Sequence, residues 1–119
     1  MRFMSMVKSK ETNGPPPKEL MEAIAKLGEE GFRSGSLVQV GGLLSTAKGA
    51  RVRVAGGKLS VTDGPFAEAK EVIGGYAVYE VASREEAIAR TKVFMELHSK
   101  HWPGWEGEAE IRQIEEQAY

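Results

Sequence analysis

VTDGPFAEAKEV, residues 61–72, lies near the middle of the chain and joins two β-like runs. Asp63 stands in a restricted turn, because Pro65 fixes its own φ and pushes Gly64 out of the helical region. Phe66 then places a large apolar ring just after the turn. A turn that only reverses the chain needs neither an aromatic ring nor the charged residues that follow, so the stretch indicates where a site lies.

Both flanks of this turn have β-strand patterns. Downstream, the strand signal is strongest over Ile73–Val81, where apolar side chains point to both faces. Upstream, polar and apolar residues alternate strictly over Arg51–Val54, which predicts one strand. The Gly56–Gly57 pair is typical of a two-residue hairpin turn, and Leu59–Val61 is predicted as the antiparallel strand that follows it. The turn at Asp63 is therefore predicted at the junction between a hairpin and the strongest strand.

The outer parts of the chain supply two helices and three more strands. A helix is predicted from Pro17 or Lys18 to about Ser34, with Gly35 as its C-terminal cap. Ser83 and Glu86 form a capping box for a second helix, which runs to about Lys100. The remaining predicted elements are strands at Arg2–Lys8, Leu37–Leu44 and Glu108–Ile114, a polar loop at Lys10–Pro17, and a polar tail at Glu115–Tyr119.

This order predicts one α+β domain over residues 1–119, a two-layer sandwich with ferredoxin-like topology. The sequence of elements is strand, helix, strand, hairpin, strand, helix, strand. Two helices can cover only one face of the sheet, yet the strand Ile73–Val81 is apolar on both. We therefore expect a homodimer, in which a second copy covers the other face.

Composition excludes several classes of partner. The formal net charge is −1, so no basic surface is predicted and no nucleic-acid partner is expected. No apolar run approaches the roughly 20 residues that span a bilayer, and no signal peptide is evident, so we expect no membrane association and a cytoplasmic location. The chain has no cysteine, and no nucleotide-binding motif is present, so no cofactor is predicted.

Asp63 is the first candidate for chemistry. The simpler interpretation is a turn residue, since Asp, Gly and Pro all favour turns. The functional interpretation is a carboxylate held on a rigid turn at the end of a sheet, acting as a general acid or base or as a ligand anchor. His98 and His101 are the candidate proton partners, although a packed helix end also explains them. Their spacing alone does not predict a metal site, because further ligands are missing.

Two further pairs of residues have alternative interpretations. Trp102 and Trp105 flank a Pro-Gly turn; they either pack against a core or a dimer contact, or line a ligand pocket. Arg51 and Arg53 share one face of their strand, where they are either solvated charges at a sheet edge or an anion-binding pair.

The motif Asp63–Glu71, followed by Gly74-Gly75-Tyr76, resembles the signature of the DGPF branch of the YCII-related domain family, with Ala69 in place of the usual Thr. This resemblance covers nearly the whole chain. It implies a ferredoxin-like fold whose sheets pair across a dimer into an α+β barrel, and a cleft near Asp63. The resemblance also implies a His paired with the Asp, as in YCII-type relatives. Their His lies in the first helix region, where this chain has none, so His98 or His101 would have to take its place beside Asp63.

Two functions follow as alternatives. One is a small enzyme acting on an unidentified small molecule, with Asp63 as acid or base, His98 or His101 as proton partner, and ligand contacts from Phe66, Lys70, Tyr76, Trp102 and Trp105. The other is a non-catalytic dimeric module that senses a ligand or binds a partner, with the link to transcription that the resemblance implies. The second function would be favoured if Asp63 were satisfied within its own turn and no pocket opened beside it.

Overall fold

Four strands and two helices form the body of the protein in the computed structural model, which describes residues 1–116. The last three residues of the predicted tail, 117–119, lie outside the described residues. The elements of the body are β1 (Arg2–Ser9), α1 (Lys18–Ser34), β2 (Leu37–Gly42), β5 (Val72–Glu80), α2 (Arg84–His101) and β6 (Gly107–Gln113).

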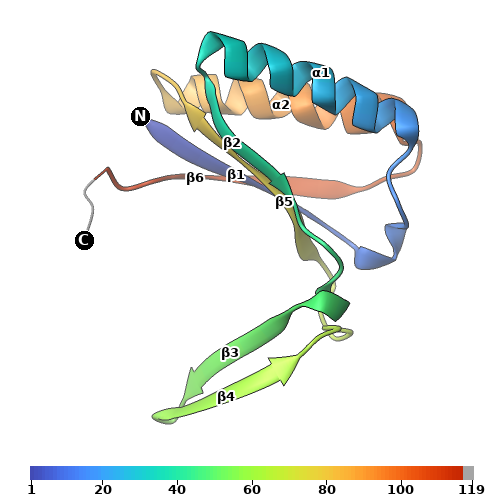
Figure 1. The fold of residues 1–119 in the computed structure, drawn as a ribbon, viewed down its shortest axis with the longest axis vertical. Coiled ribbons are helices and arrows are strands. Elements are labelled where there is room, and N and C mark those ends of the chain that lie inside the picture. The colour runs from blue at the N-terminus through green and yellow to red at the C-terminus, as the bar shows by residue number, and fades with distance from the viewer. Residues whose placement is uncertain (117–119) are drawn as a thin grey trace.

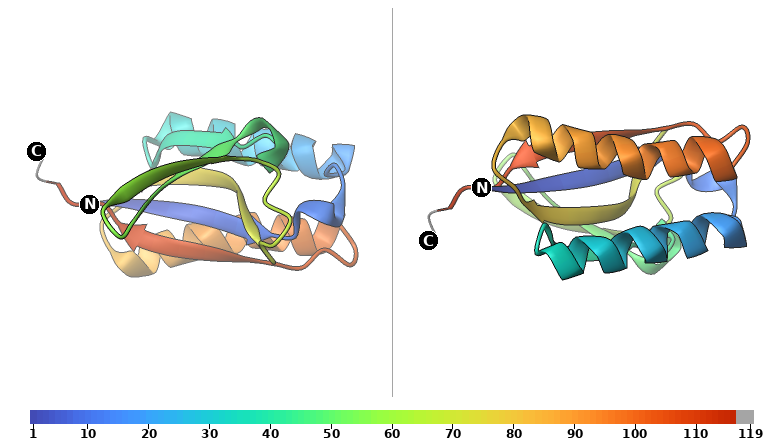
Figure 2. Two further views of the ribbon diagram at one scale, coloured as in Figure 1. Left: turned by 90° about the horizontal axis from the view of Figure 1, so that it is seen from below. Right: turned by 90° about the horizontal axis from the view of Figure 1, so that it is seen from above.

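The four strands pair antiparallel in the order β2-β5-β1-β6. This order is compatible with a ferredoxin-like fold, and the predicted α+β class is confirmed. Both helices lie on one face of the sheet, as the views from above and below show (Figure 2). The opposite face, which we call the open face, is covered by neither helix.

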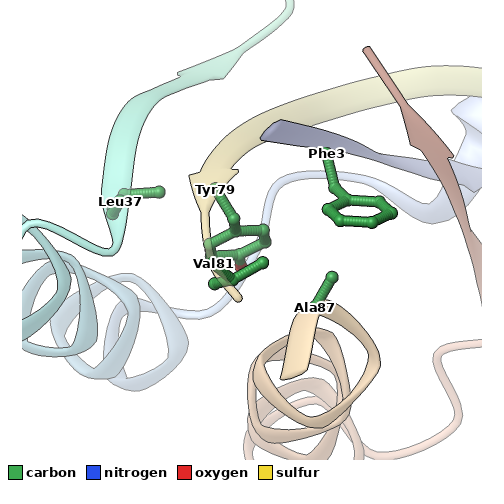
Figure 3. Close-up of a cluster of buried hydrophobic side chains, with 5 residues drawn as sticks. All are labelled: Phe3, Leu37, Tyr79, Val81 and Ala87. Atoms are coloured by element: carbon green, nitrogen blue, oxygen red, sulfur yellow. The ribbon is translucent and has the colours of Figure 1, made fainter. Parts of the chain in front are cut away.

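A small apolar core lies between the sheet and the helices, and Figure 3 shows its buried side chains. Phe3 and Tyr79 face each other across β1 and β5, and Ala87 of α2 is fully buried against this cluster. Leu20 of α1 is also fully buried. The core therefore joins the start of β1, the end of β5 and the start of α2.

The C-terminal end of α1 and the N-terminal end of α2 are formed by the capping residues that the sequence predicted. Gly35 ends α1 with φ of 80°, in the left-handed region, and its N–H donates to the carbonyl of Phe32. The Ser83 side chain accepts a hydrogen bond from the N–H of Glu86 at the start of α2. Gly31 lets α1 approach β2 closely, because a Cβ there would lie 2.8 Å from the Cβ of Leu37.

The hairpin forms a sheet of its own, made of β3 (Ala50–Ala55) and β4 (Lys58–Asp63). It projects away from the four-stranded sheet on the side opposite the helices (Figure 1). The radius of gyration is 16.0 Å, whereas a compact chain of this length has about 13.5 Å. We call this projecting hairpin, residues 50–63, the arm.

The end of β2 and the polar loop after β1 differ from the predictions. β2 ends at Gly42, so Leu43 and Leu44 do not belong to the strand as predicted. The chain instead turns into a short 3-10 helix, η2 (Thr46–Lys48), where Ser45 caps the N–H of Ala47. A second such helix, η1 (Glu11–Asn13), lies in the polar loop after β1.

Candidate functional site

The turn at Asp63 lies at the root of the arm, where the chain leaves β4. Asp63 pairs with Ala50 of β3, and the N–H of Gly64 donates to the carbonyl of Gly49 at 2.9 Å. The Gly64–Pro65 peptide bond is cis. A Cβ on Gly64 would lie 1.6 Å from the backbone oxygen of Thr46, so only glycine fits this close approach.

Glu11 and Thr46 hold the turn against the η2 segment. The Glu11 carboxylate accepts hydrogen bonds from the backbone N–H of Thr46, from Thr46 Oγ1 at 2.6 Å and from Ser45 Oγ at 3.0 Å. These bonds lower the pKa of Glu11, with the Thr46 hydroxyl contributing most. Thr46 Oγ1 in turn accepts the N–H of Phe66 at 3.1 Å. Three segments distant in the sequence therefore meet at this turn.

Arg51 fastens the loop after the turn to one face of the arm. Its guanidinium carbon lies 3.9 Å from the centroid of the Phe66 ring, a cation–π geometry. It also forms an ion pair with Glu68. The pKa of the Glu68 carboxyl is lowered. The largest cause is a hydrogen bond from its own backbone N–H, and the second is the hydrogen bond from Arg51. Arg51 is therefore engaged within the chain and is not a free charge at a sheet edge.

Asp63 lies on the other face of the arm. Alternate residues of a strand share a face, so Asp63 lies with Val61 on β4 and, across the pairing, with Ala50 and Val52 on β3. Its side chain is exposed, and its carboxylate accepts no hydrogen bond from residues 1–116. The turn thus holds Asp63 in place but leaves its carboxylate unengaged.

Two other candidates, Lys70 and Tyr76, lie apart from Asp63. Lys70 is exposed in the segment between the arm and β5. Tyr76 lies on the open face of the sheet, where its ring covers Gly41 and its hydroxyl accepts a hydrogen bond from Gln39 Nε2 at 3.1 Å. The structure therefore does not gather Phe66, Lys70 and Tyr76 around one cavity.

His98 is buried in an aromatic cluster at the end of α2. It is 6% exposed, and its ring centroid lies 4.5 Å from that of Trp105 and 4.8 Å from that of Phe94. Its Nδ1 bonds the Phe94 carbonyl at 3.1 Å, which requires the proton on Nδ1 because a carbonyl only accepts. Burial lowers the pKa of His98, against the smaller opposing effect of that bond.

The structure does not bring either histidine to Asp63. His98 and His101 both belong to α2, in the helix layer, whereas the arm projects from the opposite side of the sheet (Figure 1). The contacts of His98 are with α2 itself and with the loop before β6. Asp63 therefore has no proton partner from these residues within one chain.

Trp102 and Trp105 stack at a centroid distance of 6.0 Å. They line a shallow depression of about 390 Å³, together with Met95, Ser99, Gly104, Glu106 and Gly107. Neither Asp63 nor either histidine lines this depression. A second depression lies at residues 113–116, also away from the turn.

Sequence reasoning missed the residues that hold the turn. Glu11 lies 35 residues from Thr46 along the chain, and Thr46 lies 20 residues from Phe66. No local pattern links such residues. Within residues 1–116, no group of three or more His, Cys, Asp or Glu side chains is arranged to hold a metal ion. No helix in this range is long and apolar enough to cross a membrane.

The fold and the turn define a small α+β protein with a projecting hairpin and an acidic residue at its root. The chain belongs to the YCII-related domain family, whose model matches residues 1–94. The matched segment contains the Asp63 turn and ends before His98, His101 and both tryptophans.

One curated relative is an uncharacterized protein of Rhizobium meliloti (strain 1021). It is 32% identical over 71 residues, which is 60% of this chain and 57% of that protein. The chain therefore spans less than two thirds of the length of this relative.

Proposed function

We propose that this chain is a ligand-binding module of the DGPF branch of its family, with its site at the Asp63–Phe66 turn. The observation that carries the proposal is that Asp63 is held in place yet its carboxylate accepts no hydrogen bond within the described chain. The motif Asp63–Glu71 supports the assignment to this branch.

The surroundings of Asp63 favour a small molecule with two parts. The carboxylate accepts hydrogen bonds, so it suits an amine, an amide N–H or a hydroxyl group. Val61 and Val52 lie on the same face of the arm and are 68% and 70% exposed, so they offer contact to an apolar group beside that donor. The expected ligand is a small amphipathic molecule with a hydrogen-bond donor at one end.

Of the two conditions that favour a binding module, one holds and one does not: neither described depression is lined by Asp63, but its carboxylate is not satisfied within its own turn. The lack of a histidine partner within one chain is what favours a binding module over an enzyme. The enzyme expected from the sequence uses a histidine as the proton partner of Asp63, which requires the two side chains to lie within hydrogen-bond reach, either directly or through one water. His98, the buried histidine, is engaged with Phe94 and Trp105. The His98–Asp63 pair expected of an enzyme is therefore not formed within one chain.

Titration followed by NMR tests this function. A panel of small primary amines and alcohols with short apolar tails should shift the amide signals of Asp63, Gly64 and Phe66. Asp63→Asn should weaken the binding about tenfold or more, because a charge-assisted hydrogen bond is lost. Glu71→Gln, which removes an exposed carboxylate of the same motif, should bind as the native protein does. Equal affinity in Asp63→Asn would contradict the proposal.

The second candidate function is an enzyme in which Asp63 acts as the general acid or base. The rigid turn favours this reading, because catalysis requires a group held in a defined position. If a compound bound in the titration is converted, Asp63→Asn should lower kcat by about 100-fold or more while Glu71→Gln does not. Conversion that survives in Asp63→Asn would exclude this candidate.

A further inference from the structure

The two tryptophans of the chain form a fixed pair in the segment between α2 and β6. The N–H of Trp105 donates to the Trp102 carbonyl at 3.0 Å, and Gly104 between them has φ of 84°. Pro103 followed by a glycine with positive φ is the pattern of a type II turn. This turn brings the two rings together, with their centroids 6.0 Å apart and their planes inclined by 24°. Local backbone chemistry therefore sets the pair.

The Trp105 ring is also held by contacts outside the turn. Its centroid lies 4.5 Å from that of the buried His98. A Cβ on Gly107 would lie 2.3 Å from Trp105 Cη2, so only glycine lets the ring lie where it does. These contacts do not bury the pair, since both tryptophans are half-buried. Rings that are already held in place lose little conformational entropy when a ligand packs on them.

The depression that the pair lines has the size and the mixed composition of a ligand site. Its volume of about 390 Å³ lies in the range of about 300–1,000 Å³ that is typical of small-molecule sites. The wall combines the two indole rings and the Met95 thioether with two polar side chains, Ser99 and Glu106. All of the lining residues follow residue 94, where the match to the family model ends. Membership of the family therefore does not account for this depression.

The charge beside these rings is negative and has no partner in the described chain. Within residues 1–116, Glu106 is the only charged side chain that lines the depression, and its carboxylate forms no ion pair. The only cation–π contact among the same residues is that of Arg51 with Phe66, so neither indole ring is occupied by a cation of the described chain. Indole is the aromatic ring that attracts cations best. The wall therefore favours a positively charged ligand.

We propose that this depression binds a small organic cation with a methylated ammonium group, on a platform formed by Trp102 and Trp105 and with Glu106 as the counter-charge. The methyl groups of such a cation pack on the indole rings and on Met95, while its charge is attracted by the ring faces. A primary ammonium group suits this wall less well, because it is compact and strongly hydrated. Asp63 does not line the depression, so the proposal does not rest on the function proposed for the turn.

Choline and its neutral isostere 3,3-dimethyl-1-butanol test the preference for a cation. Both tryptophans of the chain line the depression, so intrinsic fluorescence and the two indole N–H signals in NMR report on this site alone. Choline chloride, added at an ionic strength kept constant with sodium chloride, should shift both indole signals saturably. The isostere should bind at least about threefold more weakly, because it loses the cation–π attraction and the pairing with Glu106.

Substitutions in the wall test the residues that the proposal names. Trp102→Leu should weaken choline binding about 2- to 30-fold, because one indole face is lost. Trp102→Phe keeps an aromatic face and should bind choline with an affinity between those of the native protein and Trp102→Leu. Glu106→Gln should weaken the binding of choline but not that of the isostere. Glu30→Gln is the matched control, since it removes an exposed carboxylate from α1, away from the depression, and should bind choline as the native protein does.

Circular dichroism shows which variants are folded, and Trp102→Phe and Glu106→Gln carry the test if Trp102→Leu is not. Choline that leaves both indole signals unchanged would overturn the proposal, as would equal affinity for the isostere or unchanged affinity in Glu106→Gln. Choline that shifts the amide signals of Asp63 and Phe66 without the indole signals would also overturn it, and would place the cation at the turn. Saturable indole shifts that persist in Asp63→Asn would support the site independently of the turn.

Discussion

Replacement of Gly64 by alanine should release the turn at the root of the arm. The added Cβ would lie 1.6 Å from the carbonyl oxygen of Thr46 and 2.6 Å from its carbonyl carbon. Both atoms belong to the backbone, so no flexible side chain can move aside. The η2 segment or the turn must shift instead, and the shift separates the two elements.

The cost can be worked out from the hydrogen bonds that this shift breaks. These are the bond from Gly64 N–H to the Gly49 carbonyl, at 2.9 Å, and the bond from Phe66 N–H to Thr46 Oγ1, at 3.1 Å. Each contributes about 0.5–1.5 kcal/mol net, so about 1–3 kcal/mol of local stability is lost. At 1.4 kcal/mol per tenfold change, protection of the Phe66 amide should fall about 5- to 150-fold.

Native-state hydrogen exchange by NMR measures this change directly. Exchange of the Phe66 amide should accelerate, whereas the amide of Tyr79 in the core should be affected much less, because the arm lies outside the core cluster. Gly74→Ala is the matched control, since a Cβ at Gly74 meets nothing within 4 Å. Unchanged protection of Phe66 in Gly64→Ala would refute the view that this close approach holds the turn.

Two further predictions concern the helices. Gly28→Ala should stabilise the protein by about 0.5–1 kcal/mol, because its Cβ has free space and alanine favours a helix. Gly31→Ala should destabilise it, because its Cβ would lie 2.8 Å from the Cβ of Leu37; urea denaturation of both variants tests this contrast, and equal shifts would contradict it. Burial lowers the pKa of His98 below its ordinary 6.5. As the pH falls, His98 is therefore protonated in the unfolded chain before it is protonated in the folded chain. The contribution of His98 to the free energy of unfolding should therefore be fully present above pH 6.5. It should be lost as the pH falls toward the folded-state pKa. Urea denaturation at about pH 7.5 and about pH 5.5 should show this loss in the native protein and a smaller loss in His98→Gln.

Local chemistry made most of the fold predictable from the sequence. Ser83 and Gly35 mark helix ends through contacts within a few residues, and both act as predicted. Alternation in Arg51–Val54 likewise predicted β3. Such patterns depend on neighbours in the sequence, which are always present.

The candidate site was less predictable, because its contacts join distant segments. The sequence indicates Asp63 through turn chemistry, but Glu11 and Thr46, which hold the turn, carry no signal that links them to it. The position of the arm relative to the main sheet could not be predicted from the sequence for a similar reason. Alternation predicts a hairpin with one apolar face, but it does not specify whether the hairpin joins the main sheet or projects from it.

The projecting arm also changes how the expected dimer is understood. The sequence predicted a dimer from the apolar faces of β5, yet one of those faces is filled by the helices, where Tyr79 and Val81 belong to the core. The other face carries Val78, which is already buried beside its neighbours. Among the strand residues, the large apolar side chains with the highest exposed fractions are instead on the arm. Asp63 lies on the same face of the arm, with Val61 and Leu59 on β4. Any partner that covers the arm therefore changes the surroundings of Asp63, so binding at the turn and association of the chain are expected to be coupled.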